Sequence, residues 1–366
     1  MDLLKRRFVM MAIPQIIVYG LYLYLLLGGI STFFGGINGY SLTGIVIAIL
    51  ILNYVPQFIE TMKSTIITRT LLSITEVWKW MALMYGFLTL AIYIINLAFK
   101  IPNEILIAIY LSIVPILSIY AYIKAHKIVI TPYTLKIANL KEEVKILHLS
   151  DLHIGSIRNN KLLKDVADKI SSVEADIAII SGDLADGTCK IHNESFIPLK
   201  KSKIPIIFTP GNHDIYPGID NVINASKNAN ITVLLDEKIE FKGLNIYGLP
   251  FTTSSRNQNL GIGLEESKAS GLDDYDASGT NLIVNHIPAG WEYFRSIGFD
   301  LQLSGHTHGG QFYPFTFFVK LVFPYLRGLY KEDNSYLSVT DGVGTLAPPM
   351  RLGTNAEIVL LELKPL

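Results

Sequence analysis

The stretch Ser304-Gly305-His306-Thr307-His308-Gly309-Gly310 follows a short apolar run at residues 299–303. At the extended end of a strand, residues two apart point the same way, so the two imidazoles can converge on one place. Neutral imidazole is the commonest metal ligand among side chains, and the flanking glycines let the backbone turn sharply beside it. A His-x-His pair alone is weak evidence, so its meaning depends on matching sites elsewhere in the chain.

Matching sites follow four more apolar runs, at residues 144–149, 176–180, 204–208 and 282–285. Each run predicts a short buried strand with Asp, Asn or His just beyond its carboxyl end. Open α/β sheets form their sites at those ends, so we expect these side chains to gather. The pooled donors are too many for one tetrahedral zinc ion and suit two metal ions that share a ligand. They are Asp151, His153, Asp183, Asn212, His286, His306 and His308.

In their order along the chain, these motifs resemble the five blocks of the calcineurin-like metallophosphoesterases. The blocks are Asp151-x-His153, Gly182-Asp183, Gly211-Asn212-His213-Asp214, His286 and Gly305-His306-x-His308. The tail also resembles a membrane-associated subgroup that includes transmembrane metallophosphoesterases and UDP-2,3-diacylglucosamine hydrolase-like proteins. The shared tail motifs include Gly309-Gly310-Gln311 and Gly342-Val343-Gly344. The resemblance implies a domain over residues 144–366 that folds as a four-layer αββα sandwich, with two mixed sheets covered by helices.

The resemblance further implies a metal-dependent phosphoric ester hydrolase. It assigns one divalent ion to Asp151, His153, Asp183 and His308, and a second ion to Asp183, Asn212, His286 and His306. Manganese, iron and zinc all fit these ligands. A hydroxide that bridges the two ions would attack phosphorus directly.

Three further residues are candidates for roles beside the metals. The resemblance makes His213 the proton donor to the leaving oxygen, with Asp214 orienting and charging its ring. Arg351 is a weaker candidate: it would contact substrate phosphate, as arginine does, and packing is the alternative.

Four long apolar runs fill the first 127 residues, at about 8–28, 44–58, 77–99 and 105–122. Most approach the ~20 residues that a helix needs to cross a bilayer, which predicts a four-helix transmembrane domain over residues 1–127. The second run is the shortest and the least secure span. A soluble helical bundle would need polar faces, which these runs lack. They also lack ionisable residues in mid-span, so a transport path is not indicated.

The lysines and arginines predict an orientation. Lys5, Arg6 and Arg7 precede the first span, whereas the loop over residues 28–43 carries no charge. The positive-inside rule therefore places both termini, and the catalytic domain, in the cytoplasm of a multi-pass membrane protein. The alternative is a twin-arginine export signal at Arg6-Arg7, which would place the domain outside; the motif fits imperfectly, and no small-residue cleavage site follows it.

Local patterns fill in the rest of the chain. Residues 128–143 predict a linker and a first strand, with a hairpin-like turn at Thr131-Pro132-Tyr133. Helical spacing of apolar residues predicts a one-sided helix over residues 160–173. Residues 252–280 are polar and predict a long loop near the mouth of the site. Residues 312–330 are aromatic and basic, and either lie on a membrane surface or receive an acyl chain, or else pack against the protein.

Composition bounds the function. Lys+Arg and Asp+Glu both number 31, so the net charge gives no sign of a nucleic-acid partner. The single cysteine, Cys189, excludes an intramolecular disulfide framework. We expect a membrane-anchored dimetal enzyme whose partners are the lipid bilayer and a lipid-linked phosphate substrate, such as a phospholipid. The alternative is a catalytically weak, membrane-tethered phosphate-binding scaffold, which should have lost ligands that are all present here. The preference for mono- or diesters and the oligomeric state are left open.

Overall fold

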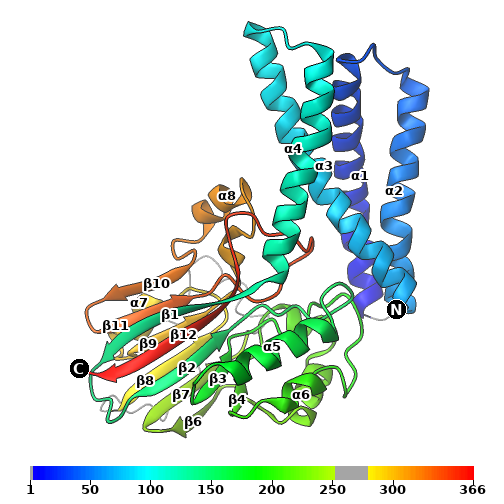
Figure 1. Cartoon of the computed structure of the whole chain (residues 1–366). Helices are drawn as coiled ribbons and strands as arrows, with labels where there is room; N and C mark the ends of the chain where they lie inside the picture. The colour runs from blue at the N-terminus through cyan, green and yellow to red at the C-terminus, as the bar shows by residue number, and fades with distance from the viewer. Residues whose placement is uncertain (1–2, 252–278) are drawn as a thin grey trace. The chain divides into compact units, whose positions relative to one another are not determined.

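The computed structural model describes residues 3–251 and 279–366, and the chain divides into two compact units (Figure 1). The helical unit is Met1–Ile123 with Ala347–Met350, and the sheet unit is Lys124–Leu346 with Arg351–Leu366. The polar loop expected at residues 252–280 lies, except for its last two residues, outside the described part of the chain.

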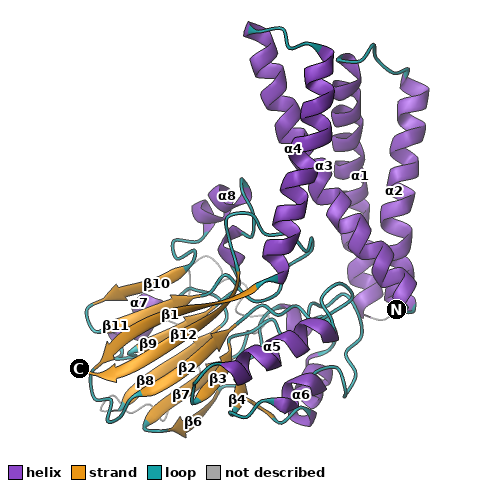
Figure 2. Cartoon of the chain, viewed as in Figure 1, coloured by secondary structure: helices purple, strands orange, loops and turns teal. Residues whose placement is uncertain are grey.

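The helical unit consists of four long helices (Figure 2). They are α1 (Leu3–Thr32), α2 (Gly39–Met62), α3 (Ile66–Ala98) and α4 (Asn103–His126). All four are long and apolar enough to cross a membrane, and no more than 28% of the most apolar window of each is buried. An apolar exterior suits helices that face lipid, whereas a soluble bundle exposes polar faces. The second helix, expected to be the shortest and least secure span, runs for 24 residues and continues through Pro56.

The sheet unit contains two six-stranded sheets. The first has the order β1 (Ile128–Ile137), β12 (Ala356–Pro365), β2 (Val144–Leu149), β3 (Ile177–Ile180), β4 (Ile206–Phe208), β5 (Ile231–Val233). The second has the order β10 (Gly328–Glu332), β11 (Ser335–Val339), β9 (Leu301–Ser304), β8 (Thr280–Asn285), β7 (Leu244–Leu249), β6 (Glu237–Phe241). Neighbouring strands from β2 to β5 are parallel, as are β7, β8, β9 and β11. The carboxyl ends of the motif-bearing strands therefore share one edge in each sheet.

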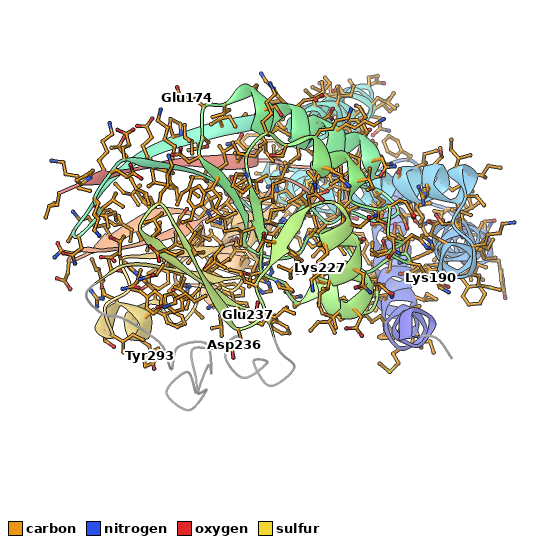
Figure 3. The ribbon with its side chains drawn as sticks, turned by 90° about the horizontal axis from the view of Figure 1, so that it is seen from below. Glu174, Lys190, Lys227, Asp236, Glu237 and Tyr293 are labelled. Carbon is orange, nitrogen blue, oxygen red and sulfur yellow. The ribbon has the colours of Figure 1, made fainter. Side chains whose placement is uncertain are left out.

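Alternating residues of each strand build the layers. Ile146 and Ile179 of the first sheet meet Leu282 and Leu303 of the second in the core between the sheets. On the outer face of the first sheet lie α5 (Asn160–Ser172) and α6 (Ile219–Asn228), and α7 (Trp291–Ser296) covers the second. Figure 3 shows Glu174, just after α5, and Tyr293, on α7, at opposite sides of the sandwich. The expected four-layer αββα architecture is confirmed.

One local expectation is wrong. Residues 128–137 form a single ten-residue strand that pairs in parallel with β12, instead of a hairpin around Thr131-Pro132-Tyr133. Pro132 lacks a backbone N–H, but β1 lies at the edge of its sheet, where only one side of the strand needs partners.

Candidate metal centre

The seven expected donors follow five strands at their carboxyl ends, three in the first sheet and two in the second. Asp151 and His153 follow β2, Asp183 follows β3, Asn212 follows β4, His286 follows β8, and His306 and His308 follow β9. Five of them have positive φ angles between 48° and 72°, a region that non-glycine residues rarely adopt: Asp151, His153, Asp183, His306 and His308. Such strained backbone persists only where the surrounding fold enforces it, and it clusters at functional sites.

The first group of donors is Asp151, His153 and His308, all buried, with ligand atoms within 4.8 Å of one another. The Nε2 atoms of His153 and His308 face each other at 3.0 Å. Oδ1 of Asp151 lies 3.4 Å from Nε2 of His308 and 3.7 Å from Nε2 of His153. Two imidazole nitrogens and a carboxylate oxygen thus surround one small volume, which is how the ligands of a cation are arranged.

The second group is Asp183, His286 and His306. Oδ2 of Asp183 lies 3.1 Å from Nε2 of His286, and Nδ1 of His306 lies 3.0 Å from Oδ1 of Asn212. The same Oδ2 of Asp183 is 3.8 Å from Nε2 of His153 in the first group. Asp183 therefore lies between the two groups, and all seven expected donors are brought together.

The charges in the cluster fit bound cations. Burial lowers the pKa of His308 to about 3, and burial with the nearby His286 lowers that of His306 to about 4. Burial alone would also lower the pKa of His153, but Asp151 and Asp186 raise it to about 10. Asp183 likewise overcomes burial and raises the pKa of His286 to about 9. Protons on two imidazoles thus balance the buried carboxylates, and metal ions would displace those protons. The donor set of imidazole nitrogens with carboxylate and amide oxygens suits divalent transition metals.

His213 lies beside this cluster. Its backbone N–H donates to Oδ1 of Asp183 at 2.8 Å, and its ring packs edge-on to that of His153 with centroids 4.8 Å apart. Its Nδ1 donates to the backbone carbonyl of Asp186 at 2.8 Å. Burial lowers the pKa of His213 below its usual value.

The expectation that Asp214 orients the His213 ring is wrong. The carboxylate of Asp214 is fully buried and accepts backbone N–H groups of Asp183, Ala185 and Gly211 at 2.7–2.9 Å. Asp214 thus ties the turn after β3 to the turn after β4, and Asp186 takes the expected role through its carbonyl. Burial and the neighbouring Asp183 raise the pKa of Asp214 to about 7.

Asp186 contacts the cluster, and the sequence motifs did not predict it. Its Oδ1 lies 3.4 Å from Nδ1 of His153, so the residue touches both His153 and His213. Carboxylates that orient metal-ligating histidines are common. The signal in the sequence is the Asp183-Leu184-Ala185-Asp186 spacing, which places a second carboxylate three residues after the first.

Arg351 is buried inside the fold, as the packing alternative expects, and its charge acts from there on His308 and Asp151 of the cluster. Its contact with substrate phosphate stays a prediction. The side chain is fully buried, and Nη2 donates to the backbone carbonyls of Asp341, Gly342 and Gly344 at 2.7–2.8 Å. Three carbonyls aimed at one point need a cationic donor, and the guanidinium satisfies them together.

Two glycines leave no room for a side chain beside the cluster. A Cβ on Gly211 would lie 2.4 Å from Oδ1 of Asp183, and one on Gly305 would lie 2.3 Å from Oδ2 of Asp151. The glycines flanking the motifs are therefore needed so that the backbone can approach the two carboxylates.

Comparison with known proteins finds relatives of this chain. The family model for calcineurin-like phosphoesterases matches residues 144–310. A metallophosphoesterase of Campylobacter jejuni is 30% identical over 294 residues, which is 78% of this chain and 78% of that protein. A metallophosphoesterase of Helicobacter pylori is 31% identical over 233 residues; the match covers 62% of this chain and 61% of that relative's length. A transmembrane protein with metallophosphoesterase domain from Danio rerio is 27% identical over 235 residues, 60% of this chain and 53% of that protein.

Proposed function

Because the chain belongs to the calcineurin-like metallophosphoesterase family, we propose that it is a membrane-anchored enzyme that hydrolyses a phosphate ester or pyrophosphate bond. The observation that carries this proposal is the pair of donor groups on either side of Asp183, which belongs to one group and lies 3.8 Å from His153 of the other. One divalent ion would be held by Asp151, His153, Asp183 and His308, and the other by Asp183, Asn212, His286 and His306. When bound, two such ions supply positive charge that binds phosphate and makes a water molecule more acidic. Manganese, iron and zinc are the candidates.

The chain's own residues position the substrate and move the proton. The ring of His213 is fixed, because Nδ1–H donates to the carbonyl of Asp186. Its Nε2 is therefore the atom that delivers a proton to the leaving oxygen. Burial favours the neutral ring, so His213 takes up this proton when the negative charge of the phosphate arrives beside it.

We propose a substrate that lies in or at the membrane, such as a phospholipid or another lipid-linked phosphate. The four apolar helices support this proposal because, as membrane spans, they would hold the enzyme at a bilayer. The likeness to transmembrane relatives supports it as well. We further propose that all four helices cross the membrane and that the sheet unit faces the cytoplasm, on the basis of the loop charges. Protease treatment of sealed vesicles tests the orientation: cleavage of the sheet unit only from the luminal or outer side would refute it.

The test of the activity is manganese-dependent hydrolysis of bis(4-nitrophenyl) phosphate by the full chain in detergent. Asp183→Asn should lose both metal and turnover, since the proposed ligand sets of both ions include this carboxylate. His213→Ala should keep its metal and turn over an alkyl phosphodiester more slowly than the wild type does. His192→Ala, at an exposed histidine outside the cluster, is the matched control and should behave as the wild type. A wild type that binds two metals but cleaves no phosphate ester would instead favour a phosphate-binding scaffold.

A further inference from the structure

The helix α8 (Phe315–Val322) lies in the sheet unit (Figure 2). Several of its large apolar side chains are exposed. Among the described residues of the sheet unit, six of the nine exposed large apolar side chains lie in one ten-residue segment. Leu321 is 84% exposed and Phe317 is 64% exposed. Concentrated exposure of this kind marks an interaction surface, whereas single exposed apolar residues need no explanation. We call this surface the α8 face; it consists of Tyr313, Phe315, Phe317, Phe318, Leu321 and Val322.

The α8 face is held rigidly beside the metal centre. The helix packs on the loop that carries His306 and His308: a Cβ on Gly310 would lie 2.5 Å from Cα of Thr316. After the helix, the ring of Phe323 packs edge-on to the ring of His306, with centroids 5.4 Å apart. The hydroxyl of Thr307 then donates to the carbonyl of Leu326. A ligand on the α8 face would therefore lie next to the candidate metal ligands.

The chemistry of the α8 face fits the hydrocarbon of a lipid bilayer. Aromatic and aliphatic side chains lie together, and the exposed Lys320 on the same helix can reach an anionic headgroup. The proposed membrane spans also connect this unit to a bilayer through the chain. The helix α4 ends at His126 and β1 begins at Ile128, so a single residue separates a candidate membrane span from the first strand of the sandwich.

We propose that the α8 face inserts into the hydrocarbon of the bilayer and that the apolar part of the substrate stays there while its phosphate reaches the metal centre. The substrate class is then an amphiphile, with a phosphate ester or pyrophosphate close to its alkyl chains. This inference rests on the proposed function, because it supplies the substrate of the same site.

Insertion is tested without turnover by a fluorescent probe. The native Cys189 is buried and is replaced by alanine, so that only an introduced cysteine carries the dye. In this background, Leu321→Cys is labelled with an environment-sensitive dye, and the protein is placed in vesicles of phosphatidylcholine and phosphatidylglycerol. We expect a blue shift of its emission and quenching by nitroxide-labelled lipids. Leu366→Cys is the matched control: it is 79% exposed but lies outside the α8 face, and its dye should stay unquenched.

Two outcomes would overturn insertion. Emission typical of water at Leu321→Cys would show that the face stays solvated. A blue shift without quenching by the lipids would show that protein covers the face, either the chain's own helices or a second copy.

Substrate delivery is tested by two substrates with the same nitrophenolate leaving group. One is the soluble bis(4-nitrophenyl) phosphate, and the other is hexadecyl 4-nitrophenyl phosphate embedded in vesicles. The doubly substituted Phe317→Ser, Leu321→Ser protein should show a ratio of lipid to soluble turnover that is about tenfold lower, because binding through the alkyl chain is lost. Leu366→Ser should leave the ratio unchanged. A wild-type ratio in the double variant refutes delivery by α8, whereas a wild type that cleaves neither compound refutes the proposed function itself.

Discussion

Replacing Gly211 by alanine tests how tightly the backbone encloses the metal centre. Gly211 is not among the residues with positive φ, so the substitution itself creates no backbone strain. The added Cβ would lie 2.4 Å from Oδ1 of Asp183 and 2.9 Å from Cδ2 of His286. Ordinary van der Waals contact begins at 3.4 Å, and the backbone nitrogen of Asp183 also lies only 2.7 Å from the added Cβ. Asp183 therefore has to move by about 1 Å, backbone included.

A shift of this size exceeds what a metal site tolerates, because ligand distances hold to within about 0.2 Å. Asp183 lies between both donor groups, so its displacement should weaken both ions together. Disturbing residues that orient ligands costs about 10–100-fold in metal affinity, and we expect Gly211→Ala to lie at the upper end of that range.

The assay is competition between the purified protein and a fluorescent chelator for manganese or zinc, which gives a Kd for each ion. Gly44→Ala is the matched control, since a Cβ there meets nothing within 4 Å. A thermal melt without metal separates loss of binding from loss of the fold. If Gly211→Ala binds both ions as tightly as the wild type, the reasoning about a closed site is refuted.

Three further predictions concern other residues. His213→Ala should slow hydrolysis of an alkyl phosphodiester by about 10²–10⁴-fold. It should slow hydrolysis of a nitrophenyl diester far less, because nitrophenolate leaves without a proton. Equal losses in kcat for the two substrates would contradict the acid role. Arg351→Met should lower the free energy of unfolding by about 3 kcal/mol or more, because three buried carbonyls lose a charged donor; a change below about 1 kcal/mol in a thermal melt would refute this. Burial raises the pKa of the half-buried Asp300 to about 6, so the folded state holds this proton longer than the unfolded chain does. The free energy of unfolding should therefore fall as the pH rises from about 4 to 6. The expected loss is about 1–2 kcal/mol once the partial exposure of Asp300 is taken into account. Asp300→Asn should remove that dependence, and an unchanged pH profile of Tm would contradict the assignment.

The strand-end motifs predict the arrangement of the donors because each motif directly follows its own strand in the sequence. An apolar run followed directly by Asp, Asn or His places the side chain at the carboxyl edge of a strand, and parallel pairing brings those edges together. The seven donors lie together for this reason, and their binding of metal stays a prediction.

The features that the sequence did not predict depend on distant partners. The turn signal at Thr131-Pro132-Tyr133 is local, whereas the strand β12 that keeps residues 128–137 extended lies more than 200 residues later. Arg351 beside two prolines is typical of a surface loop, and only the fold shows that three carbonyls converge on it. Asp186 gains its role because the turn after β3 brings it to His153 and His213.

The position of β12 between β1 and β2 sets a delay in biosynthesis. The ribosome makes β1 more than 200 residues before β12, which at 5–20 residues per second is about 10–40 s. During that interval β1 has no partner and the β2 edge of the first sheet is open, at a time when the apolar helices are already made. Nascent chains arrested before residue 356 should therefore expose an unpaired strand edge, which chaperones have to protect from pairing with other chains.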